Sequence, residues 1–411
     1  MANALLTIQM ITRQAIRLYR NSNAFIQQLD HQYDDSYAKT GAKIGTTLRI
    51  RLPNDYTVRT GQAAQVQDTN EINTSLVLAT QKGVDISFSS QDRSLSLDDF
   101  STRVLAPAVN KLAGSMALDV MSGSENFGVS NLVGNITGGV ISSPTAQTVL
   151  NTGARLSNQS AQEGSRKIVL SPTSNANIVF ALAGFFNPQQ SISKQYMTGK
   201  MQEALGFDFM QDQTVIAHTT GTLAQGSATV NGAGQTGSTL IVNALPGSLN
   251  AGDIITLAGV YMVNHVTNQS TGQLMQFGVT QNAAAGATSI SIYPAIIPAA
   301  ADGSPVQYQT VTVSPANGAA VNLAGGLGPS VTYTKNLAFV KEAITLATAD
   351  LELPRGVHEA YREEFDGISM RMITAYNIAT DQFITRLDIL YGYTYIRPEW
   401  CVVIPDVLPV G

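Results

Sequence analysis

Residues 238–263 read STLIVNALPGSLNAGDIITLAGVYMV, and this stretch decides how the chain is divided. It lies inside a longer segment, Thr222–Thr334, in which the charged side chains are Asp253 and Asp302 and which contains no Lys or Arg. Charged residues return at once on both sides of the segment, beginning with Lys335 after it. So abrupt a change in composition indicates a separate module inserted into a host domain.

The uncharged segment alternates short runs of β-forming residues with turns rich in Gly, Asn and Ser. The runs are 238–243, 253–263, 276–280 and 288–293. Short strands at regular spacing predict a small all-β barrel or sandwich. We therefore interpret Thr222–Thr334 as an inserted β module and expect the function to reside in the surrounding host.

The host begins with two features that extend beyond a compact core. Leu5–Leu18 places apolar residues at helical spacing, which predicts an amphipathic helix in an N-terminal arm. Two alternating segments, 46–60 and 75–89, enclose a polar stretch and predict a long projecting β-hairpin. Because an isolated two-stranded hairpin is marginally stable in water, we expect the hairpin and the arm to be stabilised by neighbouring molecules.

The strongest helical pattern begins at Ser96. Ser96 is a good N-cap residue and Asp99 follows three positions later, which resembles a capping box. Apolar residues then recur at steps of three and four, predicting a long helix over Ser96–Met121. Pro107 lies inside this helix, so we expect a kink or a break one turn upstream of it. The stretch 122–153 is rich in Gly, Ser and Asn and is interpreted as a linker.

The remaining host elements mix strands and helices. Strands are predicted at 166–170, 214–218 and 337–340, and a helix begins at Pro172, where a missing N–H costs nothing. Two alternating strands, with apolar faces at 368–376 and 387–391, come near the end of the chain. The fold class is therefore α+β.

Composition excludes several classes of protein. The net charge of -5 is small, which does not suit a basic nucleic-acid binder. Charged residues make up 13% of the chain, against about 25% in average soluble domains, while 44% are hydrophobic. This indicates either a β protein with many turns or a surface largely covered by other chains, since interface cores are depleted in charge.

The cysteine content and the hydropathy of the chain indicate the cellular compartment in which it is made. The single cysteine, Cys401, excludes an internal disulfide and a Cys-based zinc site. No apolar run is long enough to span a membrane, and the first residues do not form a signal peptide. We expect synthesis in a reducing cytoplasm.

One motif suggests nucleotide binding. Gly232, Gly234 and Gly237 match the GxGxxG pattern of dinucleotide sites. That mechanism needs a helix after the glycines, because the helix N-terminus meets the phosphates. The residues that follow, 238–242, are β-forming instead. A glycine-rich hairpin turn is therefore the better interpretation.

No catalytic or metal-binding set emerges from the rest of the chain. The histidines, His31, His218, His265 and His358, lack metal-ligand spacing, and His218 is interpreted as a packed or turn residue. No nucleophile with its base and acid can be assembled. We predict no catalytic residues, no cofactor, no metal and no enzymatic activity.

Several strings resemble the coat protein family of short-tailed phages related to P22. They are Gln32–Ser36, Gly41–Pro53, Tyr56–Arg59, Leu95–Phe100, Phe186–Pro188, Ala204–Asp208, His218–Gly221, Ala258–Tyr261, Gln269–Leu274 and Ala343–Asp350. The order of elements likewise resembles the HK97-type capsid fold of tailed phages, with an N-arm, an extended hairpin, a spine helix and an inserted domain. The resemblance spans nearly the whole chain.

The resemblance implies a division into capsid domains. The expected parts are an N-terminal arm at 1–45, an extended hairpin loop at 46–95, a peripheral domain with the spine helix at 96–149, an axial domain at 150–221 and 335–365, the inserted β domain at 222–334, and returning peripheral strands at 366–411.

The resemblance also implies a function and partners. It implies a major capsid protein that self-assembles, as pentamers and hexamers, into the icosahedral shell of a virion in the host cytoplasm. A scaffolding protein and a portal protein are implied partners, and a decoration protein is a further candidate. Packaged double-stranded DNA would be contacted non-specifically, and no membrane is involved.

Two sets of residues are candidates for contacts. The candidates for contacts between subunits are Arg49, Arg51, Arg59, Asp253 and Asp302. The candidates for contact with scaffold are Arg13, Arg17 and Arg20, which make the N-terminal helix basic. Two other functions stay open: a β-rich adhesin or receptor-binding protein, suggested by the β module, and an enzyme using the Gly232 turn.

Overall fold

The fold is seen in a computed structural model, which describes residues 8–34, 47–58, 61–62, 64, 66–68, 72–89, 101–182, 203–365, 367–378 and 382–408. These residues form two compact units. The first contains 1–51, 73–120 and 344–396; the second contains 52–72, 121–343 and 397–411. Strands and helices are mixed in both units, which confirms the predicted α+β class.

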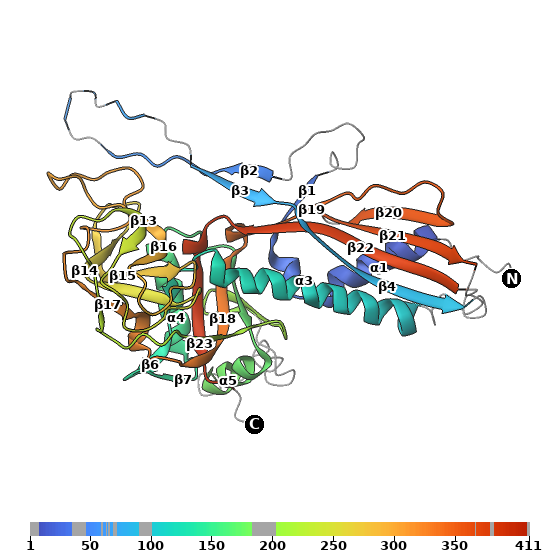
Figure 1. Ribbon diagram of the computed structural model, residues 1–411, viewed down its shortest axis with the longest axis horizontal. Helices are drawn as coiled ribbons and strands as arrows, with labels where there is room; N and C mark the ends of the chain where they lie inside the picture. Colours follow the sequence, from blue (N-terminus) through green and yellow to red (C-terminus); the bar gives the residue numbers. More distant parts are fainter. Residues whose placement is uncertain are drawn as a thin grey trace. The chain divides into compact units, whose positions relative to one another are not determined.

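A six-stranded sheet is the body of the first unit (Figure 1). Its order is β1-β19-β22-β21-β20, with β4 also paired to β22. The strands are β1 (Asp30–Asp34), β4 (Thr80–Ser89), β19 (Ile344–Ala349), β20 (Glu359–Phe365), β21 (Ile368–Asn377) and β22 (Gln382–Tyr395). The two alternating strands predicted near the end of the chain are β21 and β22. β22 is long enough to pair with β19 near its end and with β21 and β4 before that.

Helix α1 (Ile8–Ser22) packs against β20 and β21 of the same unit. Ala15, Ile16 and Tyr19 lie on its buried face, and the Tyr19 hydroxyl is 3.1 Å from the sulfur of Met116. The predicted amphipathic helix therefore exists. The expectation that it needs a neighbouring molecule is wrong, because its apolar face is already covered by its own chain.

The predicted hairpin starts from a short ladder. β2 (Thr47–Arg51) pairs with β3 (Asn73–Val77), and Leu76 and Leu78 are buried beside Leu390. Gly392 lies directly under this ladder. A Cβ added to Gly392 would come 2.1 Å from the carbonyl oxygen of Val77, so only glycine allows the two strands to cross so closely.

The spine helix is described from residue 101 onward. A π-helical turn, η4 (Ser101–Leu105), precedes α3 (Ala106–Asn126). This change of helix type immediately before Pro107 confirms the break predicted there. The predicted N-cap Ser96 and Asp99 lie outside the described residues. The helix runs beyond its predicted end at Met121.

The second unit contains a seven-stranded sheet with two helices. Its order is β5-β23-β18-β8-β10-β9, with β11 also paired to β18. The strands are β5 (Asn131–Leu132), β8 (Arg166–Leu170), β9 (Glu203–Ala204), β10 (Phe207–Gln211), β11 (Ala217–Thr219), β18 (Thr332–Val340) and β23 (Cys401–Asp406); the helices are α4 (Ala146–Asn158) and α5 (Pro172–Leu182). Strand β8 and the start of α5 at Pro172 are as predicted, while β11 begins three residues later than predicted.

The predicted linker at 122–153 is wrong, because the structure there is regular. β6 (Asn135–Thr137) and β7 (Val140–Ser142) form a hairpin, and Gly138 and Gly139 both have positive φ at its two-residue turn. Thr145 then caps α4, since its hydroxyl accepts from the amide of Thr148 and the Thr148 hydroxyl accepts from the amide of Thr145. This is a capping box built with threonine instead of Glu or Gln.

The β module is an antiparallel barrel. The strand order is β12-β17-β14-β15-β16-β13, and a bridge between Val230 and Val242 joins the two ends. The strands are β12 (Ala228–Thr229), β13 (Gly237–Ile241), β14 (Ile254–Val263), β15 (Ser270–Val279), β16 (Ser289–Ile296) and β17 (Ala320–Leu323). Gly232 and Gly234 have positive φ in the turn before β13, and Gly237 has positive φ where β13 begins, so the glycine-rich turn is confirmed.

Short helical turns complete the described chain. They are η1 (Ile26–Gln28), η6 (Ala324–Gly326), η7 (Lys341–Ala343) and η8 (Pro398–Trp400). In the described part of the chain, none of the helices has the length and apolar character that crossing a membrane requires.

Candidate functional site

The hairpin arginines lie where a neighbouring molecule could reach them. Arg49 and Arg51 are both exposed on β2, two residues apart and therefore on one face of the ladder. Arg59 lies outside the described residues. The position of Arg49 and Arg51 fits the prediction of inter-subunit contacts without testing it.

The tip of the hairpin exposes large apolar side chains. Val58 and Val66 are each 93% exposed, and Tyr56 is 56% exposed. The backbone here is tied to the barrel, because the amide of Tyr308 donates to the carboxylate of Asp55 over 2.8 Å. The tip is thus held in place while its apolar side chains remain uncovered.

The scaffold candidates follow helix α1. The Arg13 guanidinium lies 3.0 Å from the carboxylate of Glu363 on β20, and this hydrogen bond raises the pKa of Arg13. Arg17 is exposed, and Arg20 belongs to the helix, with its side chain outside the description. The prediction did not foresee that Arg13 would be paired within its own chain.

The two acidic residues of the β module have different surroundings. Asp302 is exposed, and its Oδ1 accepts from the amide and the hydroxyl of Ser304, which lowers its pKa. Asp253 is 1% exposed. Its carboxylate is occupied by partners in the same chain, so the prediction of Asp253 as an inter-subunit contact does not fit its position.

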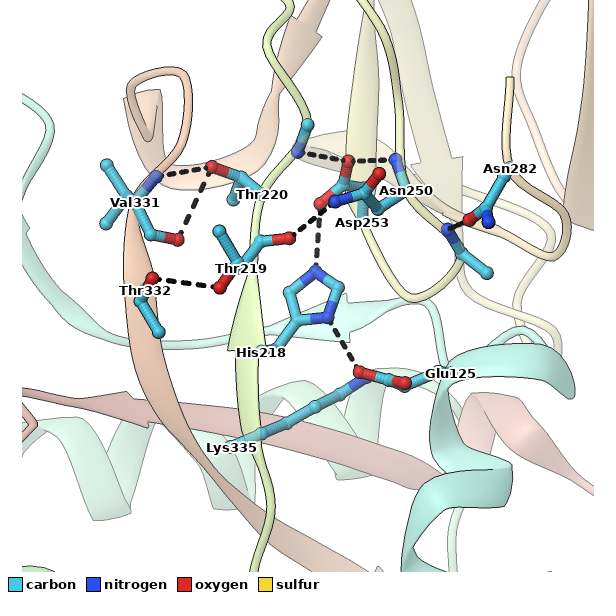
Figure 2. A network of polar contacts seen from close by, with 12 residues as sticks. Glu125, His218, Thr219, Thr220, Asn250, Asp253, Asn282, Val331, Thr332 and Lys335 are labelled. Atoms are coloured by element: carbon cyan, nitrogen blue, oxygen red, sulfur yellow. Dashed lines mark hydrogen bonds and ion pairs between the residues drawn. The ribbon is translucent and has the colours of Figure 1, made fainter. Parts of the chain in front are cut away.

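Asp253 belongs to a largely buried group of charged side chains from α3, β11, β18 and the start of the β module (Figure 2). We call His218, Glu125, Asp253 and Lys335 the neck cluster. His218 Nε2 lies 2.9 Å from Asp253 Oδ1, and His218 Nδ1 lies 2.8 Å from Glu125 Oε1. The imidazole is 3% exposed and sits between two carboxylates.

Backbone groups hold Asp253 in this position. Its Oδ2 accepts from the amide of Gly221 at 3.0 Å and from the amide of Asn250 at 2.7 Å. The Asn250 side chain donates in turn to the carbonyl of Thr219 at 2.9 Å (Figure 2). A carboxylate that accepts several N–H bonds is stabilised in its ionised form.

Lys335 is the fourth member of the neck cluster and comes from β18. It is 1% exposed, its Nζ lies 3.4 Å from the carbonyl oxygen of Ser124, and burial lowers its pKa to about 8. For Glu125, burial alone would raise the pKa, but the hydrogen bond from His218 and the charge of Lys335 lower it. When all four groups are ionised, the two positive charges of His218 and Lys335 equal the two negative charges of Glu125 and Asp253.

The chain enters and leaves the β module side by side. β11 pairs with the start of β18, where His218 is opposite Tyr333 and Thr219 is opposite Thr332. The amide of Ser330 donates to the carbonyl of Gly221 at 2.9 Å. Paired ends are the geometry expected of a module inserted into a host.

Other hydrogen bonds connect the β module to the surrounding chain through uncharged acceptors. Arg155 of α4, 5% exposed, donates to Asn131 at 2.7 Å and to Gln273 of β15 at 3.0 Å, and burial lowers its pKa to about 10. Gln276 of β15 accepts from the amide of Leu132 at 2.8 Å. Sequence reasoning missed the contacts of Gln273 and Gln276, because their partners are more than a hundred residues away in the chain.

No group of His, Cys, Asp and Glu able to hold a metal ion occurs among the residues that the structure describes. The neck cluster includes a histidine and two carboxylates, but a buried lysine accompanies them. A neighbouring ammonium group disfavours a metal cation. The arrangement is suited to holding structure together and to titrating, not to metal chemistry.

Comparison with known proteins identifies one family. The family model described as P22 coat protein (gene protein 5) matches residues 8–404. No curated protein matches the chain.

Solved structures resemble the chain at low identity. The capsid of cyanophage P-SCSP1u is 9% identical with a TM-score of 0.45, covering 94% of this chain and 89% of its own. The capsid of Ralstonia phage GP4 is 8% identical with a TM-score of 0.44, covering 94% and 92%. The CUS-3 coat protein I-domain is 28% identical with a TM-score of 0.20, covering 25% of this chain and 98% of its own.

Proposed function

This chain belongs to the P22 coat protein family, and we propose that it builds a phage shell by covering its exposed hairpin tip with neighbouring subunits. It is a major capsid protein that forms an icosahedral shell. The described α+β architecture agrees with the fold expected of the family. The adhesin and enzyme alternatives have no comparable support.

The exposed apolar hairpin tip carries this proposal. Val58 and Val66 each leave 93% of their surface in water, and Tyr56 leaves more than half. Burying such side chains stabilises by about 1.5–3 kcal/mol each, so a partner surface has much to contribute. Because a shell offers every subunit the same neighbours, sister copies are the natural partners.

The charged side chains of β2 would contribute to the specificity of assembly more than to its affinity. Arg49 and Arg51 would form ion pairs with acidic side chains of a neighbour, and Arg59, which lies outside the described residues, is kept as a further candidate. Exposed pairs contribute about 0–1 kcal/mol each. Shell stability therefore arises from many weak contacts per subunit, which also allows five-fold and six-fold rings to share the same surfaces.

We assign no catalytic step, cofactor or metal to the protein. Its further partners would be a scaffolding protein, a portal protein, packaged double-stranded DNA contacted non-specifically and, in some shells, a decoration protein. The basic face of α1 with Arg13, Arg17 and Arg20 is the proposed scaffold contact. Assembly would take place in the host cytoplasm, and the product is a component of the virion.

The capsid domains proposed from the sequence are kept as a proposal. The paired ends at Gly221 and Ser330 support Thr222–Thr334 as an inserted domain. Residues 150–221 and 335–365 would then be the axial domain, and the remaining parts would be the arm, the hairpin and the peripheral domain.

The test is assembly of a variant carrying Val58→Asp and Val66→Asp. We expect the purified subunit to keep its circular dichroism spectrum while negative-stain microscopy and sedimentation show few closed particles. The matched control is Val140→Asp on β7, which also places an acid at an exposed valine, 67% exposed, and should assemble normally. Normal yield of shells from the double variant would contradict the proposal. Discrete trimers from the unchanged protein would favour an adhesin.

A further inference from the structure

The His218 ring must carry two protons to serve both of its partners. A neutral imidazole has one N–H, whereas both ring nitrogens of His218 lie within 3 Å of a carboxylate oxygen. A neutral ring would leave either the buried Asp253 Oδ1 or the partly buried Glu125 Oε1 without its donor, which is costly. An imidazolium ring satisfies both.

The surroundings place the proton on the ring and not on a carboxylate. Asp253 accepts two backbone N–H bonds at Oδ2 in addition to the His218 contact, and these favour its ionised form. Glu125 has Lys335 near it as well as His218, so its ionised form is favoured too. Both carboxylates therefore act as acceptors.

The cluster joins three separate pieces of the second unit. Glu125 belongs to the last turn of α3, His218 to β11, and Asp253 to the module, just before β14. Gly252 shows how closely these pieces approach, because a Cβ added there would lie 3.0 Å from the side chains of Glu125 and Lys335. The imidazolium ring connects the host helix to the module across this contact.

Among the residues that the structure describes, the charged or titratable groups facing the ring come from α3, the module and β18. Glu125 faces it from α3, Asp253 from the module, and Lys335 and Tyr333 from β18, the Tyr333 ring lying edge-on at 5.5 Å. Burial raises the pKa of Tyr333 far above its usual range, so this phenol remains neutral. Loss of the His218 proton would leave the cluster with a net negative charge, and either Asp253 Oδ1 or Glu125 Oε1 would lose its donor from the ring.

We propose that protonated His218 is a latch between the β module and helix α3. Loss of its proton at alkaline pH loosens the contact between the module and α3 at the neck cluster. The latch is reversible and needs no ligand. The ties made by Arg155 and Gln276 do not depend on His218, so the module would loosen at the neck while remaining attached along β15. The subunit thereby gains a protonation-controlled joint at the place where the module meets the host.

The direction of the pH effect follows from the pKa of His218. Burial alone lowers this pKa, but the hydrogen bonds to Asp253 and Glu125 outweigh burial and the charge of Lys335, so the pKa lies above its usual value of 6.5. Stability from the latch is therefore complete below about pH 6.5 and is lost as pH rises through the folded-state pKa. Lys335 acts in the opposite direction, since the cost of burying its charge is relieved above about pH 8.

The proton itself is measured by hydrogen exchange at the imidazole C2 carbon, followed by mass spectrometry of the intact, unmodified chain over a pH series. We expect His218 to titrate above 6.5, the ordinary value for histidine. A pKa at or below this value would overturn the proposal. This experiment needs no variant, so a folding defect cannot obscure it.

The loosening is measured by amide exchange in the same samples, corrected for the intrinsic rate. Between about pH 6 and about pH 9, we expect protection at Gly221 and Asn250 to fall about tenfold or more, as expected for losing a hydrogen bond to a charged group. The amide of Leu132, bonded to Gln276, is the internal reference and should keep its protection. If the protection of the Gly221 and Asn250 amides changed with pH no more than that of the Leu132 amide, the proposed latch would be wrong.

Two variants separate the latch from general stability. His218→Gln should show weak neck protection already at about pH 6 and no further dependence on pH, whereas the control His358→Gln should behave as the unmodified chain does. Lys335→Met removes the cation that opposes protonation, so it should raise the pKa of His218. A His218 pKa that is unchanged in Lys335→Met would contradict the coupling of the four groups.

Discussion

Arg371 of β21 and Asp388 of β22 form a buried ion pair in which their side chains approach to 2.7 Å. Asp388 is fully buried, and Arg386 also reaches it, with 2.8 Å between Arg386 Nε and Asp388 Oδ1. The strands that carry the pair are directly hydrogen-bonded, and Arg371 is opposite Asp388 in their register. The single charge of Asp388 is therefore shared by Arg371, whose side chain is 14% exposed, and Arg386, whose side chain is 51% exposed.

Removing that carboxylate should strongly destabilise the subunit. We expect Asp388→Ala to lower the free energy of unfolding by about 3–5 kcal/mol, because a buried guanidinium is left without its counter-ion. Urea unfolding of the unassembled subunit measures the change. The control is Asp85→Ala. The Asp85 side chain is 66% exposed and lies 3.7 Å from Arg386, so its removal should lower the free energy of unfolding by about 0–1 kcal/mol. Similar losses in the two variants would contradict the buried pair.

Two glycines should respond in opposite ways to alanine. Gly392→Ala places a Cβ 2.1 Å from the carbonyl oxygen of Val77, so the hairpin ladder must shift, and we expect a loss of about 1–3 kcal/mol. Gly114, inside α3, has open space around its Cβ position, and Gly114→Ala should stabilise by about 0.5–1 kcal/mol through helix propensity. Thermal unfolding of both variants, compared in one buffer, checks the signs. A stabilised Gly392→Ala would show that the crossing is looser than described.

The β module could be predicted well because its pattern is local. Alternating residues and glycine turns identify β13 and β14 at nearly their observed bounds, whereas the predicted runs cover only the last part of β15 and the first part of β16. The closure of these strands into a barrel could not be predicted, since it depends on the bridge between Val230 and Val242. Local sequence determines strands, while the way they close is determined by contacts between them.

Helix α4 shows why a regular element was mistaken for a linker. Thr148, Thr152 and Arg155 are polar or charged residues on its buried face, so the apolar stripe that indicates a helix is weak. Its capping box uses Thr148 in place of an acid or amide, which removes the second signal. Polar residues that satisfy one another inside a protein conceal the periodicity on which sequence interpretation relies.

The neck cluster could not be predicted for a different reason. Glu125, His218 and Lys335 are far apart in the sequence, and each alone is compatible with a surface position. The abrupt loss of charge in the module did single out Asp253, but it suggested an outward contact. The pairing of β11 with β18 brings His218 to the strand of Lys335, and the hydrogen bonds of the imidazole connect it to Glu125 and Asp253.

The basic face of α1 should contribute unequally to scaffold binding. Arg13 is already paired with Glu363 of the same chain, whereas Arg17 is exposed, so Arg17 has more to offer an acidic partner. We expect Arg17→Ala to reduce co-assembly with scaffolding protein by about three- to tenfold, and Arg13→Ala to reduce it less, since exposed charge contacts contribute about 1 kcal/mol. Co-sedimentation of subunit with scaffold at low and moderate salt measures both, and the difference should shrink as salt screens the contact. If Arg13→Ala were the more damaging change, the Glu363 pair would have to open during assembly, and the scaffold contact would lie on the Arg13 side of the helix.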